Sequence, residues 1–336
     1  MSERKHLGHL DLLRGIAALA VVLFHFSNST LPTVKPNLLG PLFSWGDLGV
    51  QVFFVISGFV IPFAMDQSRY NLQNAGQFLA KRMVRLGPPS WIAMGLIIMI
   101  YYAAIWKNGQ PIEGMDWPGM SVSGVFANMF YAFDSTGIKP FYSVLWTLEA
   151  ELQYYVVISL VFPLIIRFSG FALGALPILA GLLLMYPLHA YNLIFFKYIA
   201  LFVMGITAFL FMTERLKPNV FLLSAAAIIA VCFLQLGLPC TIAGGLTMFA
   251  IVHLKAANKF ATFLGTISYS LYITHHFSGI TAEFIVKSLL GGVYEPWGKI
   301  LLLFIFTAIS IAFAYLFFRL VEKPFMQLAA RIKFKK

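Results

Sequence analysis

Guanidinium, imidazole and carboxylate groups stand inside apolar runs of this sequence that are long enough to cross a membrane. The first run, Leu10 to Ser29, carries Asp11 and Arg14 near one end and His25 near the other. Ionisable groups are costly inside a bilayer, so such residues are candidates for function. Arg14 and His25 are eleven positions apart, close to three helical turns, so they project from one helix face roughly 16 Å apart along its axis.

Other titratable residues are expected at the depth of His25, in the outer half of the bilayer. Glu149 and Glu151 fall in the first half of the fourth span, which runs inward, and His275 and His276 lie about thirteen residues into the ninth span, which runs outward. A buried carboxylate beside an imidazole can orient the ring and raise its basicity, which suits a general base. The sequence therefore predicts an acid–base site beneath the outer face.

Basic residues define a second level at the cytoplasmic boundary. Arg82 and Arg85 are three positions apart, so they share one helix face, and Arg14 is expected at the same depth. Two guanidiniums on one face can bind a phosphate through bidentate hydrogen bonds. Together the two levels suit a reaction between a cytosolic phosphorylated donor and an outer acceptor.

Each of these groups also has a structural interpretation. The arginine pair is compatible with ordinary positive-inside anchors, and Glu149 and Glu151 with a pair bonded to neighbouring helices. A histidine at a helix end, such as His25, can sit in the headgroup region. Ser57 is compatible with a close contact between helices.

The composition is that of a polytopic membrane protein. The 336 residues are 60% hydrophobic and only 11% charged, with a mean hydropathy of +0.83, whereas soluble domains average about 25% charged residues. A net charge of +11 would suggest nucleic acid in a soluble chain, but here the basic residues serve as topology determinants, and no nucleic-acid partner is expected. Cys232 and Cys240 have no metal-ligand spacing, so no metal site is predicted.

The fold expected is an all-α bundle of about ten transmembrane spans. Most of the 24 Lys and Arg fall on one side if both termini are cytoplasmic. The connecting segment 66–85 is predicted to form a cytoplasmic hairpin and an amphipathic helix, and segment 107–140 a lid or re-entrant piece. The expected spans are 10–29, 47–65, 86–106, 141–166, 171–189, 191–212, 220–238, 240–254, 262–285 and 300–321.

The chain is expected to form a single integral membrane domain over residues 1–336. Its basic start followed by an apolar run imitates a signal peptide, but the run is too long and contains charges, so we expect it to be retained.

Six motifs, in order along nearly the whole chain, resemble the acyltransferase 3 family of integral membrane O-acyltransferases. They are Leu10–Gly15 with the following His25, Gly49–Phe59, Arg82–Arg85, Trp146–Tyr155, Ser268–His275 and Glu322–Phe325. Each motif alone is weak, and the specificity of the resemblance comes from their order and separation.

The chain departs from the family pattern at three places. Leu13 stands where Gly is common, and Thr274 replaces a Trp before the late histidine. The family's carboxylates are often adjacent, whereas here Glu149 and Glu151 flank Ala150, and Glu151 aligns better. No extracytoplasmic domain of the kind found in longer relatives is expected after the last span.

The resemblance implies transfer of an acyl group, often acetyl, from cytosolic acyl-CoA to a hydroxyl of a cell-envelope or exported carbohydrate or glycolipid. It implies a multi-pass protein of the inner cell membrane that uses acyl-CoA as a substrate and holds no bound cofactor. The implied catalytic residues are His25, as general base, and Glu151. Arg14, Arg82 and Arg85 would serve the CoA phosphates or the helix framework. The residues expected to support the site are Asp11, Glu149, Ser57, Trp146, Tyr272 and His275.

Two other functions are compatible with these residues. A proton-coupled secondary transporter could use the intramembrane histidines and glutamates as a relay, and an inverted repeat with broken helices would favour it. No such repeat is evident in the sequence. A membrane sensor or scaffold with a decayed site is opposed by the presence of every expected polar residue.

Overall fold

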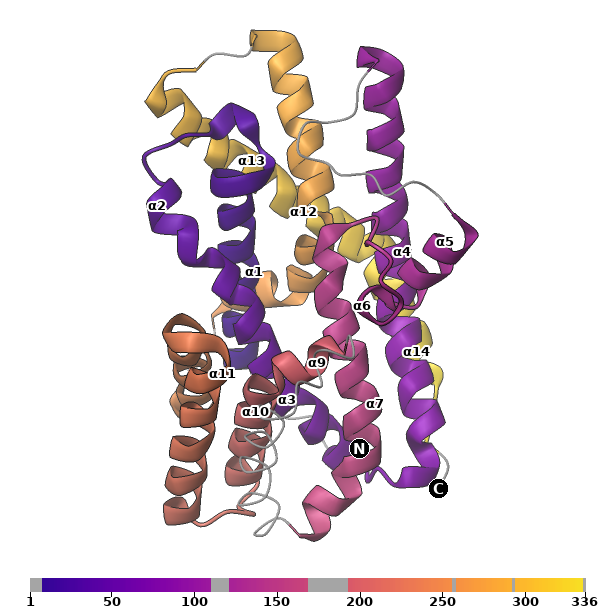
Figure 1. The fold of residues 1–336 in the computed structure, drawn as a ribbon, viewed down its shortest axis with the longest axis vertical. Helices are drawn as coiled ribbons and strands as arrows, with labels where there is room; N and C mark the ends of the chain where they lie inside the picture. The colour runs from indigo at the N-terminus through magenta and orange to yellow at the C-terminus, as the bar shows by residue number, and fades with distance from the viewer. Residues whose placement is uncertain (1–7, 110–120, 169–192, 256–257, 292–293, 335–336) are drawn as a thin grey trace.

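The computed structural model describes residues 8–109, 121–168, 193–255, 258–291 and 294–334, and these residues form helices and no strand (Figure 1). The helices of three turns or more are α1 (Gly8–Phe24), α3 (Gly49–Gln67), α4 (Ala75–Asn108), α7 (Trp146–Arg167), α10 (Ile199–Met212), α11 (Pro218–His253), α12 (Lys259–Leu290) and α13 (Pro296–Phe317). The shorter helices are α2 (Gly40–Phe43), α5 (Val122–Met129), α6 (Phe133–Thr136), α9 (Ile194–Lys197) and α14 (Lys323–Arg331).

Among the described residues, 6 helical stretches are long and apolar enough to cross a membrane. They are Gly8–Thr30, Gly40–Gln67, Leu72–Lys107, Ser143–Arg167, Pro218–His253 and Pro296–Arg331. The prediction of an all-helical membrane protein is confirmed. The expected spans 191–212 and 262–285 correspond to the helical segments α9–α10 and α12, and the expected span 171–189 lies outside the described residues.

The predicted cytoplasmic helix and the third span form one continuous helix. Helix α4 begins at Ala75 and runs to Asn108, through Pro88 and Pro89. The polar residues of segment 66–85 that precede it form a turn and the short 3₁₀ helix Leu72–Asn74. Arg82 and Arg85 therefore lie on the same rigid helix as the apolar span that follows them.

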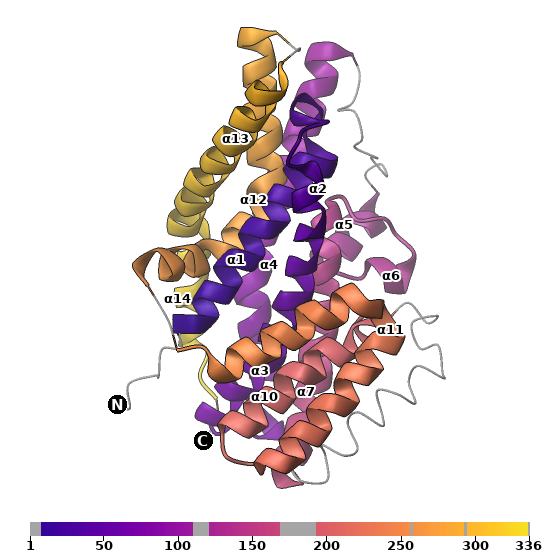
Figure 2. The same cartoon turned by 90° about the vertical axis from the view of Figure 1, so that its left-hand side faces the viewer.

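A bend at Gly237 divides α11 into two arms, as Figure 2 shows. The backbone of Gly237 has φ 77° and ψ 179°, a combination that glycine adopts without the steric penalty of a Cβ atom. The predicted spans 220–238 and 240–254 correspond to the two arms.

Helices α1 and α12 run parallel and make the most extensive helix contact in the described chain (Figure 2). They cross where Gly15 lies against Leu264 and Gly265, and small residues at such crossings let two backbones approach closely. Beyond α1, the backbone N–H of Thr33 donates to Glu283 Oε1 of α12 at 2.6 Å, 250 positions apart in the sequence. The same separation of 250 positions relates Gly15 to Gly265, so the two helices keep one register from the crossing to this hydrogen bond.

Helices α3 and α10 cross at a second pair of glycines. A Cβ atom at Gly58 would overlap the backbone of Phe202, and one at Gly205 would overlap the backbone of Val55. The interpretation of the Ser57 region as a close helix contact is therefore correct, and this contact fixes the direction in which Ser57 projects from α3.

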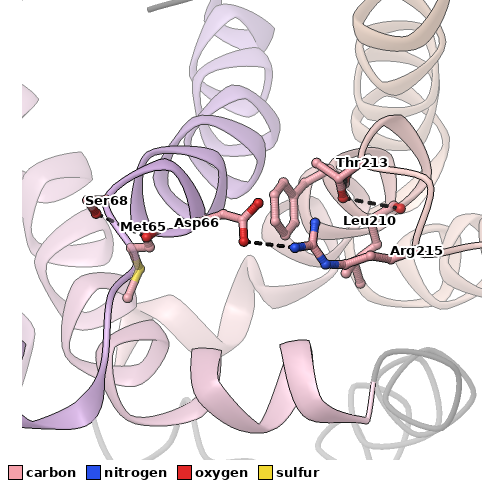
Figure 3. A network of polar contacts seen from close by, with 7 residues as sticks. Met65, Asp66, Ser68, Leu210, Thr213 and Arg215 are labelled. Carbon is pink, nitrogen blue, oxygen red and sulfur yellow. Dashed lines mark hydrogen bonds and ion pairs between the residues drawn. The ribbon is translucent and has the colours of Figure 1, made fainter. Parts of the chain in front are cut away.

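An ion pair joins two connections at the lower end of the bundle in Figure 1. Asp66, in the last turn of α3, accepts a hydrogen bond from Arg215 Nη2 at 2.9 Å, just after α10 (Figure 3). The guanidinium of Arg215 also lies 5.8 Å from the ring centroid of Phe209. The pair links the last turn of α3 to the loop between α10 and α11.

Helix α7 begins well below the upper ends of α4 and α12 in Figure 1. The residues before it, within the predicted outer segment 107–140, form α5 and α6 beside the bundle, while residues 110–120 lie outside the described residues. This placement sets the depth of every side chain on α7.

Candidate functional site

A cavity between α1, α3, α4, α7 and α12 gathers the three arginines predicted from the sequence. Its volume is about 880 Å³ measured out to its open mouth, within the usual range of ligand pockets. We call it the arginine cavity. Its polar lining residues are Arg14, Ser57, Arg82, Arg85, Thr147, Glu151, Tyr155, Tyr269 and Tyr272.

The arginines enter this cavity from two helices. Arg82 and Arg85 project from one face of α4, as their spacing of three predicts, and Arg14 enters from α1. The guanidinium of Arg82 lies 5.4 Å from the ring centroid of Phe78 and 5.5 Å from that of Tyr155, and its buried Nε has no hydrogen-bond partner. Stacking between aromatic rings holds the guanidinium plane while leaving donors for a ligand.

Glu151 lies in the arginine cavity and not beside His25, which corrects the expected depth. Its Oε1 accepts hydrogen bonds from Ser57 Oγ at 3.0 Å and from the hydroxyl of Tyr155. The expectation assumed that α7 starts at the outer face, whereas α5 and α6 precede it and α7 starts lower. Glu151 is therefore a counter-charge among the arginines.

Glu149 has a structural environment. It is 1% exposed, and its carboxylate accepts hydrogen bonds from the backbone N–H of Phe133 at 3.0 Å and from Gln153 Nε2 at 3.3 Å. Phe133 is the first residue of α6, so Glu149 ties α6 to α7. The expectation that Glu149 shares a level with His25 is also wrong.

Three imidazoles meet at the end of α1, and we call His25, His275 and His276 the histidine cluster. The ring centroids are 5.1 Å apart for His25 and His275, 4.6 Å for His25 and His276, and 4.5 Å for His275 and His276. The histidines of the first and ninth expected spans thus lie in contact with one another. The parallel register of α1 and α12 brings the rings together.

Local hydrogen bonds of His25 and His275 indicate which ring nitrogen is free in these two residues. Ser29 Oγ donates to the backbone carbonyl of His25 at 3.2 Å and lies 3.1 Å from His25 Nδ1. With the Ser29 proton directed at that carbonyl, the hydroxyl oxygen accepts the proton of His25 Nδ1, and in this tautomer His25 Nε2 keeps its lone pair. Likewise His275 Nδ1 lies 2.7 Å from the carbonyl oxygen of Tyr272 and must carry the proton of that contact.

Tyr272 stands between the arginine cavity and the histidine cluster. It lines the cavity, and its ring centroid is 6.1 Å from that of His275. Its hydroxyl is 3.0 Å from Thr147 Oγ1 and donates to the carbonyl of Val144 at 3.1 Å. The two polar levels are therefore adjacent across one aromatic side chain.

Asp11 and Trp146 lie outside the arginine cavity. Asp11 packs against Gly265 at the α1–α12 crossing, within electrostatic range of Arg14. Trp146 packs its ring against Phe54 and Tyr198, with centroid distances of 6.2 and 5.5 Å. Both residues support the helix framework around the site.

Glu322 is a site residue that the sequence reasoning missed as a functional group. It is 2% exposed, accepts a hydrogen bond from Ser270 Oγ at 2.6 Å, and lies within electrostatic range of Arg85 and Arg14. In the sequence, the signal for Glu322 was its place in the closing motif, and the same residues before Pro324 are also compatible with the end of a helix. It lies in a π-helical turn, Phe318–Glu322, which turns it towards the arginines.

His25 also opens a π-helical segment, His25–Thr30. Such segments are rare and often occur at functional sites, because the wider turn redirects side chains that an α-helix would place elsewhere. Residue periodicity does not predict them. Both π-helical segments of the described chain therefore carry titratable residues of the site.

Comparison with known proteins gives a family and several relatives. The profile of a family described as an acyltransferase domain matches residues 7–319. The chain is 29% identical to a peptidoglycan O-acetyltransferase, OatA, of Listeria monocytogenes. The match extends over 169 residues, which is 46% of this chain and 24% of that protein. It is 28% identical over 176 residues to O-acetyltransferase OatA of Staphylococcus aureus, covering 50% and 26%.

A further relative is the exopolysaccharide production protein ExoZ of Rhizobium meliloti, 29% identical over 142 residues, or 41% of this chain and 38% of that protein. These matches span between about a quarter and two fifths of the relatives' own length. No solved structure matches the chain.

Proposed function

We propose, since the chain belongs to this acyltransferase family, that it transfers an acetyl group from cytosolic acetyl-CoA to a hydroxyl of a cell-envelope or exported carbohydrate. The observation that carries the proposal is the adjacency of the arginine cavity and the histidine cluster across Tyr272. One site suits a polyanionic donor and the other suits proton transfer.

The arginine cavity suits the phosphates of CoA. The cavity lining carries three guanidiniums, those of Arg14, Arg82 and Arg85, and one carboxylate, that of Glu151. Asp11 and Glu322 lie outside this lining, within electrostatic range of Arg14. Guanidiniums bind phosphate oxygens through pairs of hydrogen bonds, and a cavity with surplus positive charge attracts a phosphorylated ligand. The thioester would then point past Tyr272 towards His25.

His25 would act as the general base. Its Nε2 takes the proton of the acceptor hydroxyl while the oxygen attacks the thioester carbonyl carbon. The new carbon–oxygen ester bond forms, the carbon–sulfur bond breaks, and CoA leaves as the thiolate, which His25 can reprotonate. Glu151 takes part from the donor side, as the carboxylate that accepts a hydrogen bond from Ser57 and acts as a counter-charge to Arg14 and Arg82.

The chain would form one membrane domain over residues 1–336, with about ten spans, both termini in the cytoplasm, in the inner cell membrane. Two observations support this topology. Helices α1 and α12 run parallel, as the predicted outward direction of both requires. The bias of Lys and Arg supports cytoplasmic termini.

The test is transfer of radiolabelled acetyl from acetyl-CoA by the purified protein in lipid nanodiscs, with mass spectrometry of envelope carbohydrates from cells with and without the gene. The proposal expects label on carbohydrate and the loss of an acetyl mass increment without the gene. A transporter would be indicated instead if the protein binds a labelled sugar, moves it unmodified across a vesicle membrane and transfers no acetyl group.

A further inference from the structure

The histidine cluster offers a set of ligand atoms beyond the single base that acetyl transfer needs. One ring nitrogen from each of His25, His275 and His276 can be chosen so that all three lie within 4.8 Å of one another. Imidazole is the side chain that zinc, copper and nickel bind most often, through a nitrogen lone pair. Three such nitrogens supply three of the four ligands of a tetrahedral metal site and leave the fourth position open.

The hydrogen bonds of the cluster leave lone pairs without donors. The Nε2 atoms of His275 and His276 are buried and have no hydrogen-bond partner among the described residues. His275 Nδ1 is held by the carbonyl of Tyr272, and His25 Nδ1 lies beside Ser29. A ring whose Nδ1 proton is held by a carbonyl or hydroxyl presents Nε2 to a metal, which is the arrangement usual for metal-binding histidines.

We propose that His25, His275 and His276 bind a divalent transition-metal ion, with Zn²⁺ as the best-fitting candidate. Zinc lies about 2.1 Å from each histidine nitrogen, which places tetrahedral ligand atoms roughly 3.4 Å apart. Small side-chain rotations bring nitrogens that now lie within 4.8 Å to that separation. His25 and His276 are partly exposed, whereas His275 is buried.

Metal binding and base catalysis exclude each other at His25. The lone pair of Nε2 can hold a metal ion or accept the acceptor's proton, but not both. If the chain has the proposed function, the histidine cluster is therefore an inhibitory site. Bound Zn²⁺ blocks acetyl transfer, and a chelator restores it.

Direct metal binding tests the site independently of activity. The purified full chain in nanodiscs is titrated with Co²⁺, whose visible absorption reports tetrahedral nitrogen ligands, and with Zn²⁺ as competitor. We expect one ion per chain, and binding at least tenfold weaker in His276→Ala and in the more conservative His276→Gln. The matched control is His253→Ala. The ring of His253 packs against Phe249 at the end of α11, away from the histidine cluster, and metal binding by this variant should equal that of the unmodified chain.

Two results would overturn the site: absence of the Co²⁺ absorption band, or equal binding by the His276 variants that fold as judged by thermal denaturation. Activity is measured separately, with and without chelator. Loss of transfer on adding Zn²⁺ supports inhibition, whereas loss on adding chelator overturns it. If no transfer is detected under any condition, the proposed function fails while the Co²⁺ titration still decides the metal site.

Discussion

His25 of α1 and His275 of α12 stand with their ring centroids 5.1 Å apart because their helices cross in register at Gly15 and Gly265, ten residues earlier on each. The same offset continues to the hydrogen bond between Thr33 and Glu283. The geometry of the histidine cluster is therefore set at a glycine crossing about three helical turns away.

Widening that crossing should damage the site from a distance. In Gly265→Ala the new Cβ would overlap the backbone of Asp11, so α1 and α12 must separate or shift. We expect a loss of about 1–3 kcal/mol in stability, typical of overpacking, and slower acetyl transfer. Thermal denaturation and transfer assays measure the two effects.

The matched control is Gly95→Ala in α4, where nothing lies within 4 Å of the added Cβ. An alanine in an open helical position should be neutral or gain up to about 1 kcal/mol. Equal behaviour of the Gly265 and Gly95 variants would show that the crossing does not control the histidines.

Removing both α4 arginines should weaken donor binding. In the double variant Arg82→Ala, Arg85→Ala the cavity loses two of its three guanidiniums, each able to make charge-assisted hydrogen bonds of about 1.5–3 kcal/mol. We expect KM for acetyl-CoA to rise at least tenfold while KM for the acceptor changes little. Lys81→Ala, a basic residue of the same helix outside the cavity lining, is the control, and an unchanged donor KM would make the arginines mere anchors.

The depth of a side chain could be predicted only where its helix is continuous from the membrane edge. Counting residues from the ends of the first and ninth spans correctly placed His25 and His275 together. The same count failed for Glu149 and Glu151, because it could not show that residues before α7 fold into α5 and α6 and lower its start.

Two further features depend on tertiary packing that periodicity does not encode. The π-helical turns at His25–Thr30 and Phe318–Glu322 have no sequence signature, so the direction of His25 and the burial of Glu322 became evident only in the fold. The arginine spacing on α4, by contrast, is a local helical property, and it predicted the shared face correctly.

The two glutamates of α7 should separate function from stability. Glu151→Gln removes a charge from the arginine cavity but retains an acceptor for Ser57, so we expect slower transfer with little change in thermal stability. In Glu149 both carboxylate oxygens accept hydrogen bonds, from the Phe133 N–H and from Gln153 Nε2, so the NH2 of Glu149→Gln would face one of these donors. We expect this buried change to lower stability by about 1–3 kcal/mol. Equal effects of both variants on turnover would contradict this division, as would a catalytic loss confined to Glu149.

Glu322 should act by positioning Arg14 and Arg85. In Glu322→Gln the hydrogen bond from Ser270 can persist, but the like charges of Arg14 and Arg85 lose a counter-charge and repel each other. We expect KM for acetyl-CoA to rise about tenfold, near the free energy of one charge-assisted bond. Glu295→Gln, an exposed residue before α13, is the control, and an unchanged or lower donor KM in the Glu322 variant would refute the positioning role.

The central claim is that His25 takes the acceptor's proton beside an independent donor cavity. The most direct measurement is the single-turnover rate of acetyl transfer by His25→Ala, with acetyl-CoA affinity determined on the same sample. The account predicts a rate lower by about 10²–10⁴, the usual contribution of a general base, with donor Kd unchanged. A rate within about twofold of the unmodified chain, at full donor occupancy, would contradict it.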